Sequence, residues 1–206
     1  MYAAARNTGK AVTEFLTQKM LLMAIYERWN EVKVSGAAKR IGVSTKSASR
    51  CFDELEYLNI DVLGTKGKSR VINIPDDREQ LWQQIESVLR NPVIRRFVLR
   101  EDMKLEKKAG ISALCEYSLL SDHVYPTYAV TKKELKASGA KEEKQASELE
   151  EIGCVVWELG YFIDFLGKGL QDPLSVVLSL TGEEQEEERV DISINEMLEE
   201  YVWSKD

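Results

Sequence analysis

Hydrophobic positions near the start of the chain recur at helical spacing. Apolar residues between positions 12 and 29 repeat with a period close to 3.6, which predicts a helix whose start Thr13 or Thr17 could cap. A shorter apolar face follows, for which Ser35 is the expected N-cap. Gly42 stands where this second helix should end, because glycine readily adopts the left-handed conformation at a helix C-terminus.

A third helix is expected over residues 45–58, with Ser44 as its N-cap. Its apolar positions are Ala48, Cys51 or Phe52, Leu55 and Leu58. The opposite face begins with short polar or long basic side chains, namely Ser44, Thr45, Lys46, Ser47, Ser49 and Arg50. Carboxylates appear only from Asp53 onward. Such a helix can enter the major groove of DNA with its N-terminus first, because its dipole favours phosphate and its side chains reach base edges.

The hydrophobic period changes after this helix. Two β-rich runs, residues 60–63 and 71–74, flank a glycine-bearing segment, which predicts a β-hairpin. The tip carries Lys66, Lys68 and Arg70 and no carboxylate. Cations in this position are suited to contact the phosphate backbone of a duplex.

The order of three helices and a basic hairpin over about residues 13–75 resembles the winged helix-turn-helix module of MarR-type bacterial regulators. The resemblance implies an α+β fold with a DNA-binding domain at residues 1–75. It also implies binding of double-stranded DNA by a homodimer that engages two half-sites. A winged helix used only for protein contacts, without DNA binding, is the alternative interpretation.

Residues 76–206 mix the two periods, which predicts a small mixed α/β domain. Helices are predicted at 76–89, 109–120, 172–180 and 192–203, and strands at 93–100, 126–130 and 154–159. Residues 132–151 are predicted to be either a solvated helix or a mobile connection, and residues 181–188 a charge-dense link.

Part of this second half is similar to the body of AbiEi-type proteins, which are antitoxins that also repress transcription. The similarity lies in the helix that begins Ala109-Gly110-Ile111-Ser112-Ala113-Leu114 and in the strand that Pro126 opens. Asp172-Pro173-Leu174-Ser175 and the acidic helix after it resemble the ending of related bacterial regulators. The resemblance implies a repressor that autoregulates a toxin–antitoxin operon, with a nucleotidyltransferase-type toxin as its protein partner. The late part of the chain lacks a strong basic patch, apart from the arginines near 95–100.

Charge is distributed unevenly along the 206 residues. Residues 1–75 contain 12 Lys and Arg against 7 Asp and Glu, a net charge of +5, whereas the remainder has 16 against 28, or −12. This pattern favours a polyanionic partner at one end of the chain. The absence of a secretory pattern, of a membrane-spanning run and of an even set of cysteines predicts a cytoplasmic protein with no membrane contact.

Residues that could carry catalysis are sparse. His123 is the single histidine, and the three cysteines lie too far apart in sequence to suggest a zinc site. We therefore expect no catalytic residues, no metal, no cofactor and no enzymatic activity. A regulator that responds to a small molecule is an alternative, with a pocket formed by aromatic residues: Trp82, Trp157, Tyr161, Phe162 and Phe165.

Overall fold

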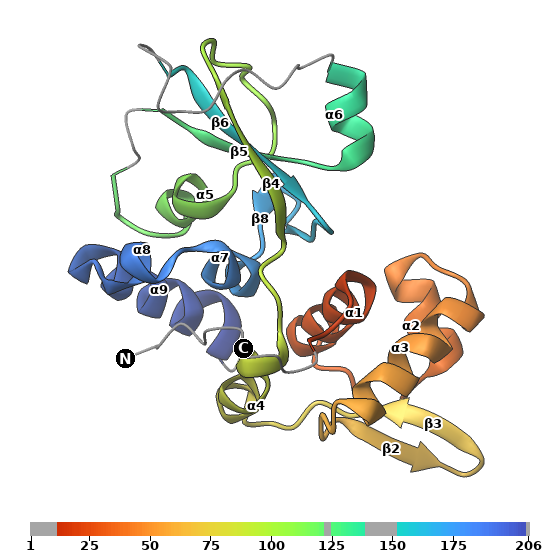
Figure 1. Ribbon diagram of the computed structural model, residues 1–206. Helices are drawn as coiled ribbons and strands as arrows, with labels where there is room; N and C mark the ends of the chain where they lie inside the picture. The colour runs from red at the N-terminus through yellow and green to blue at the C-terminus, as the bar shows by residue number, and fades with distance from the viewer. Residues whose placement is uncertain (1–11, 122–124, 139–151, 205–206) are drawn as a thin grey trace. The chain divides into compact units, whose positions relative to one another are not determined.

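A computed structural model describes residues 12–121, 125–138 and 152–204 (Figure 1). It is a mixed α+β structure, which confirms the predicted fold class at that level. The chain divides into two compact units, one that ends at Arg90 and one that starts at Asn91. None of the described helices is long and apolar enough to cross a membrane.

The first unit combines four α-helices with a small sheet among its described residues. Its elements are α1 (Phe15–Tyr26), β1 (Val32–Lys33), α2 (Val34–Ile41), α3 (Thr45–Tyr57), β2 (Leu63–Lys66), β3 (Ser69–Ile72), α4 (Arg78–Ile85) and the 3-10 turn η1 (Glu86–Val88). The three strands are antiparallel in the order β1-β3-β2. The helices and the hairpin thus follow the predicted order, and the two-residue strand β1 is an addition.

Helix α1 lies at the centre of this unit. Seven of its side chains are buried, over rather more than half of its circumference: Thr17, Gln18, Met20, Leu21, Leu22, Ala24 and Ile25. The other five side chains of the helix are half-buried, so α1 belongs to the core rather than to the surface. Trp29, Phe52, Leu55, Ile72 and Trp82 contribute further large, fully buried side chains.

The start of α1 differs from its prediction. Neither threonine caps the helix: the Thr13 hydroxyl donates to Gln18 Oε1 at 2.7 Å, and the Thr17 hydroxyl donates to the Glu54 carboxylate. Glu14 precedes the helix without a side-chain cap, and its amide donates to Glu54 Oε1 at 2.6 Å. The orphan amide is therefore satisfied from α3, which no local sequence rule indicates.

Residues 76–90 belong to the first unit, not to the second as expected from the boundary after residue 75. The Thr13 amide donates to the Val88 carbonyl at 2.9 Å. The buried Gln18 side chain exchanges two hydrogen bonds with the Arg90 backbone, at 2.8 and 2.9 Å. Trp82 of α4 is completely buried. These contacts tie the segment to α1.

The second unit is built around a three-stranded sheet. Its elements are β4 (Val93–Leu99), α5 (Gly110–Tyr117), β5 (Thr127–Val130), α6 (Lys132–Ser138), β6 (Cys154–Leu159), β7 (Asp164–Phe165), β8 (Leu170–Gln171), α7 (Pro173–Ser179), α8 (Gly182–Glu186), α9 (Glu188–Leu198) and the π-helical end η3 (Glu199–Trp203). In the order β4-β6-β5, β4 is antiparallel and β5 parallel to β6.

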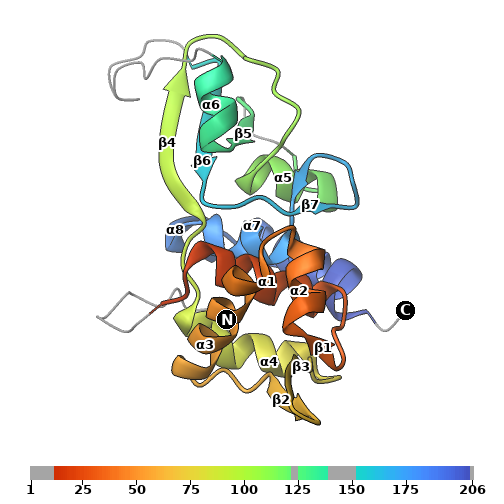
Figure 2. The same cartoon turned by 90° about the vertical axis from the view of Figure 1, so that its right-hand side faces the viewer.

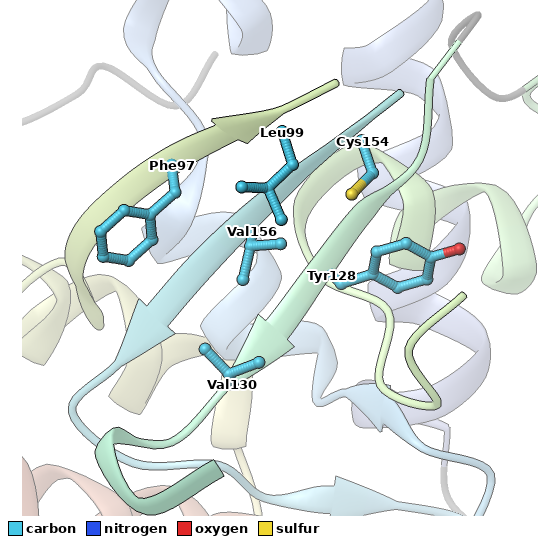
Figure 3. Packing of buried hydrophobic residues seen from close by; sticks show 6 residues of the cluster. All are labelled: Phe97, Leu99, Tyr128, Val130, Cys154 and Val156. Carbon is cyan, nitrogen blue, oxygen red and sulfur yellow. The ribbon is translucent and has the colours of Figure 1, made fainter. Parts of the chain in front are cut away.

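Both faces of this sheet are covered. Alternate residues of the strands form one apolar cluster, Phe97, Leu99, Tyr128, Val130, Cys154 and Val156, against which Leu135 of α6 packs (Figure 3). Trp157, Leu159, Ala129 and Ala109 form the cluster on the other face, beside α5 (Figures 1 and 2). Gly110 begins α5 with a φ of +53°, and a Cβ there would lie 2.4 Å from the Trp157 ring. Glycine at this position therefore permits the close approach of α5.

A buried polar network joins α5 to β8 and α7. The Gln171 side chain accepts from the Gly110 amide at 3.0 Å and donates to Ser179 Oγ at 2.8 Å. The Tyr117 hydroxyl donates to the Gln171 carbonyl at 2.9 Å. Asp172 caps α7 through the Ser175 amide at 3.0 Å, so the predicted helix start at Asp172-Pro173 is confirmed.

Two predictions for the second unit were wrong in detail. Residues 181–188 are not an irregular link, because Thr181 and Glu184 form a capping box that starts α8. The last helix begins at Glu188 rather than at residue 192, and the β7–β8 hairpin was not predicted. Residues 132–138 form α6, whereas 139–151 lie outside the described residues.

Candidate nucleic-acid interface

The turn between α2 and α3 fixes the start of α3. Gly42 ends α2 in the left-handed conformation, with φ 71° and ψ 37°, and the Val43 amide donates to the Ala38 carbonyl at 3.0 Å. Ser44 is extended, and its hydroxyl accepts from the Ser47 amide at 3.1 Å. The predicted roles of Gly42 and Ser44 are confirmed. The predicted cap at Ser35 was wrong, because α2 begins at Val34 with Lys33 as its N-cap residue, and Ser35 lies inside the helix.

Helix α3 separates its residues as its sequence pattern indicates. Ala48, Cys51, Phe52 and Leu55 are buried. The candidate recognition residues lie at the surface: Ser44, Thr45, Lys46 and Arg50 are exposed, and Ser47 and Ser49 are half-buried. Lys46 and Arg50 are one helical turn apart and therefore share a face.

The hairpin has a tighter tip than predicted. Lys66 pairs with Ser69, so that only Gly67 and Lys68 form the turn. Gly67 has a φ of +63°, which glycine accepts at the first position of a two-residue hairpin turn. Lys66 and Lys68 are exposed at this tip.

Arg70 connects the hairpin to α3. Its guanidinium donates to Asp53 Oδ1 at 2.6 Å and to Ser49 Oγ at 3.0 Å, with Glu56 Oε2 3.7 Å away. The guanidinium also lies 5.7 Å from the centre of the Phe52 ring. These contacts link β3 of the hairpin to α3. Arg70 is thus engaged within the unit rather than directed to solvent.

The remaining cations fall into two groups. Lys66 forms an ion pair with Glu31, which lies just before β1. Lys46, Arg50 and Lys68 form no ion pair with any residue that the structure describes. Since charges without an internal partner are available to an external anion, these three residues are the electrostatic centre of the candidate interface.

Two carboxylates neutralise part of this surface, and their ion pairs with the hairpin were not predicted. The hairpin tip has no acidic residue of its own, but Glu31 and Asp53 reach it from segments 35 and 17 residues away in the chain. Asp53 lies four residues after Ser49 and therefore shares its face of α3. This spacing was the one indication in the sequence that a carboxylate stands beside the candidate DNA-binding residues.

Two arginines of β4 make contacts within the second unit. Arg95 pairs with the buried carboxylate of Glu158 at 2.5 Å. The Arg96 guanidinium lies 4.7 Å from the centre of the Trp157 ring and donates to the Ser179 carbonyl at 3.1 Å. These contacts explain why two basic residues stand on β4 without implying a nucleic-acid site there.

The five aromatic residues considered for a ligand pocket are distributed over both units. Trp82 is in the core of the first unit, and the other four are in the second. Trp157 packs against the sheet, and the Tyr161 hydroxyl lies 2.9 Å from Ser175 Oγ. Packing and hydrogen bonding account for the burial of these two side chains.

In the part of the chain that the structure describes, no group of three or more His, Cys, Asp and Glu side chains could hold a metal ion. His123 lies outside the described residues.

Comparisons of the chain with protein-family models, with curated proteins and with solved structures found no match to any of them.

Proposed function

We propose that the first unit is a winged helix-turn-helix module that binds double-stranded DNA, with α3 as the recognition helix and the β2–β3 hairpin as the wing. The observation that carries the proposal is the Arg70 link between hairpin and helix. Because of that link, one unit presents both the N-terminal turns of α3 and the hairpin tip as exposed, basic elements.

In the proposed binding mode, different side chains would contact base edges, contact phosphates and position the helix. Thr45 and Lys46 lie at the N-terminus of α3, where they would reach base edges in the major groove. Arg50 and Lys68 would contact phosphates, as cations without an internal partner. The Ser44 hydroxyl caps α3 through the Ser47 amide and lies 2.9 Å from the Ser47 hydroxyl, so Ser44 serves to position the helix start.

The acidic second half of α3 restricts this mode. Asp53 and Glu56 lie one to two turns beyond Arg50 and would repel a phosphate backbone. The duplex would therefore meet the N-terminal half of α3, which is the geometry of a helix that enters the groove end-on.

The biological role follows as part of the same proposal. A homodimer would place two copies of α3 on two half-sites of an operator. The AbiEi-like features of the second unit support a cytoplasmic repressor of a toxin–antitoxin operon, with the toxin as its protein partner. A nucleotidyltransferase-like gene next to this one would support that role, and its absence would favour a regulator of another kind.

A gel-shift titration against the upstream region of the protein's own gene tests DNA binding. We expect Lys46→Ala combined with Arg50→Ala to abolish the shift, because two phosphate or base contacts are lost from each protomer. In the wild-type protein, the logarithm of the binding constant should fall with the logarithm of salt concentration, with a slope of about −0.9 for each phosphate contact.

Lys132→Ala combined with Lys133→Ala is the matched control. It removes the same charge from exposed positions of α6 in the second unit. This variant should retain the shift, and both variants should unfold at the wild-type temperature. Retention of wild-type affinity by the α3 double variant would show that α3 does not contact DNA.

A further inference from the structure

A groove with an apolar floor and an acidic rim lies in the second unit, between the end of α5 and the helix α9 with its extension η3. Two adjoining hollows, of about 490 and 720 Å³, form it and share Leu119 and Glu196. Both hollows are lined by residues of this unit alone. The groove belongs to the second unit, whereas the proposed DNA-binding surface belongs to the first.

Two large apolar side chains are exposed along the groove. Leu119 follows α5 and is 100% exposed, and Ile192 of α9 is 50% exposed. Beneath them, the buried Ile111 and Val190 and the half-buried Leu120 line the same hollow and form its apolar floor. Exposed apolar residues are ordinary when they stand singly, but their clustering in a groove is typical of a binding surface.

The rim is strongly acidic. It contains Glu116, Glu187, Glu196, Glu199 and Glu200 against a single cation, Arg189. Lys108 pairs with Glu116, whereas the other four carboxylates form no ion pair with any described residue. A ligand that lies in the groove would therefore be attracted by positive charge at its edges.

One wall of the groove, formed by α9 and η3, carries its lining residues at helical spacing. Ile192 and Glu196 are one helical turn apart on α9, and Glu199 and Glu200 continue the stripe along η3. A stripe that is apolar at one end and acidic at the other is complementary to an amphipathic helix with cations beside its apolar face. From this complementarity we propose that the groove docks a basic amphipathic helix of a partner protein.

Fluorescence anisotropy with labelled synthetic peptides of about 18 residues tests the proposal. The probe has leucine at positions i, i+3, i+4 and i+7 and lysine on its flanks. One reference peptide replaces every lysine with glutamate, and another scrambles the lysine peptide so that it has no apolar face. We expect the lysine peptide to bind at least about tenfold more tightly than either reference, and more weakly as salt is added.

Two pairs of variants locate the binding, each with a matched control. Leu119→Ser with Ile192→Ser removes the two exposed apolar side chains of the groove, and Ile94→Ser with Leu166→Asn removes similarly exposed apolar residues elsewhere in the same unit. Glu196→Gln with Glu199→Gln removes two rim charges, and Glu183→Gln with Glu186→Gln removes two exposed charges of α8. We expect each groove pair to weaken binding by about tenfold or more and each control pair by less than about twofold.

Other results would overturn the proposal. Equal losses in groove and control variants would show general attraction between a cationic peptide and an acidic unit. Equal binding of the scrambled peptide would exclude recognition of an amphipathic helix. Light scattering that finds a dimer of the protein alone, dissociated by Leu119→Ser with Ile192→Ser, would assign the groove to a second copy. If Leu119→Ser with Ile192→Ser fails to fold, the comparison of Glu196→Gln with Glu199→Gln against its α8 control still tests whether the peptide binds in the groove.

Discussion

Glu134 shows how a single side chain organises the start of α6. Its carboxylate accepts hydrogen bonds from the Thr131 amide at 2.7 Å and the Thr131 hydroxyl at 2.8 Å, and it pairs with Lys107. Burial by itself would raise the pKa of Glu134, but the hydrogen bonds from Lys107 and Thr131 outweigh it and lower the pKa to about 2. The ionised carboxylate is thus the form that the fold stabilises.

Replacement of Glu134 by Gln should make stability less dependent on pH. A folded-state pKa below the ordinary 4.5 means that the wild-type carboxylate contributes fully above pH 4.5 and loses its contribution as the pH falls through 2. We expect the variant to lose less than about 1 kcal/mol of unfolding free energy at pH 7, because the pair is partly exposed, and nothing near pH 2. Urea titrations between pH 2 and 7 measure this difference. A difference that is constant with pH would contradict the assignment.

Residue roles were predictable where they depend on neighbours in sequence. Gly42 and Ser44 were identified because a left-handed helix end and an N-cap are local features. The partners of Lys66 and Arg70 were not, because Glu31 and Asp53 come to the hairpin only through the packing of β3 beside β1 and α3. Sequence therefore indicated which cations lie at the surface but not which of them are already neutralised.

At the scale of elements, the hydrophobic periodicity predicted the order of the helices and of the hairpin strands in the first unit. It did not predict the shortest elements of either unit. Strand β1 has two residues and pairs with β3, so no alternation marks it in the sequence. In the second unit, α8 was missed although Thr181 and Glu184 have the spacing of a capping box. The dense run of carboxylates at residues 183–188 favoured a link there, although the capping box predicts a helix.

The two glycines of α2 should respond in opposite directions to alanine. Gly42 has a φ of +71°, so Gly42→Ala should lower the unfolding free energy by about 1 kcal/mol through backbone strain, although space for a Cβ is open. Gly36 lies within the helix, and its added Cβ would meet Val32 at 3.4 Å. Gly36→Ala should therefore raise stability, by up to about 1 kcal/mol. Thermal unfolding compares the two, and equal effects would contradict the left-handed helix end.

At the scale of the whole molecule, the division of the chain was the least accessible feature. The first domain was predicted to end after residue 75, because the excess of basic residues ends there. With the observed boundary, residues 1–90 contain 14 Lys and Arg against 11 Asp and Glu, and residues 91–206 contain 14 against 24. The net charges are then +3 for the first part and −10 for the second, so the two parts still differ in charge, but this difference does not locate the boundary. Contacts of Gln18 and Trp82 locate it, and these join segments far apart in the sequence.

A fragment of residues 1–90 should consequently fold where a fragment of residues 1–75 does not. The shorter fragment lacks Trp82, whose removal from a core costs about 3–5 kcal/mol, and it leaves the buried Gln18 amide without the Arg90 backbone. These losses are comparable to the whole stability of a small domain, about 5–15 kcal/mol. We expect cooperative thermal unfolding of the longer fragment, followed by circular dichroism, and none of the shorter one. If both fragments unfolded cooperatively at the same temperature, α4 would be dispensable and the boundary would belong at residue 75.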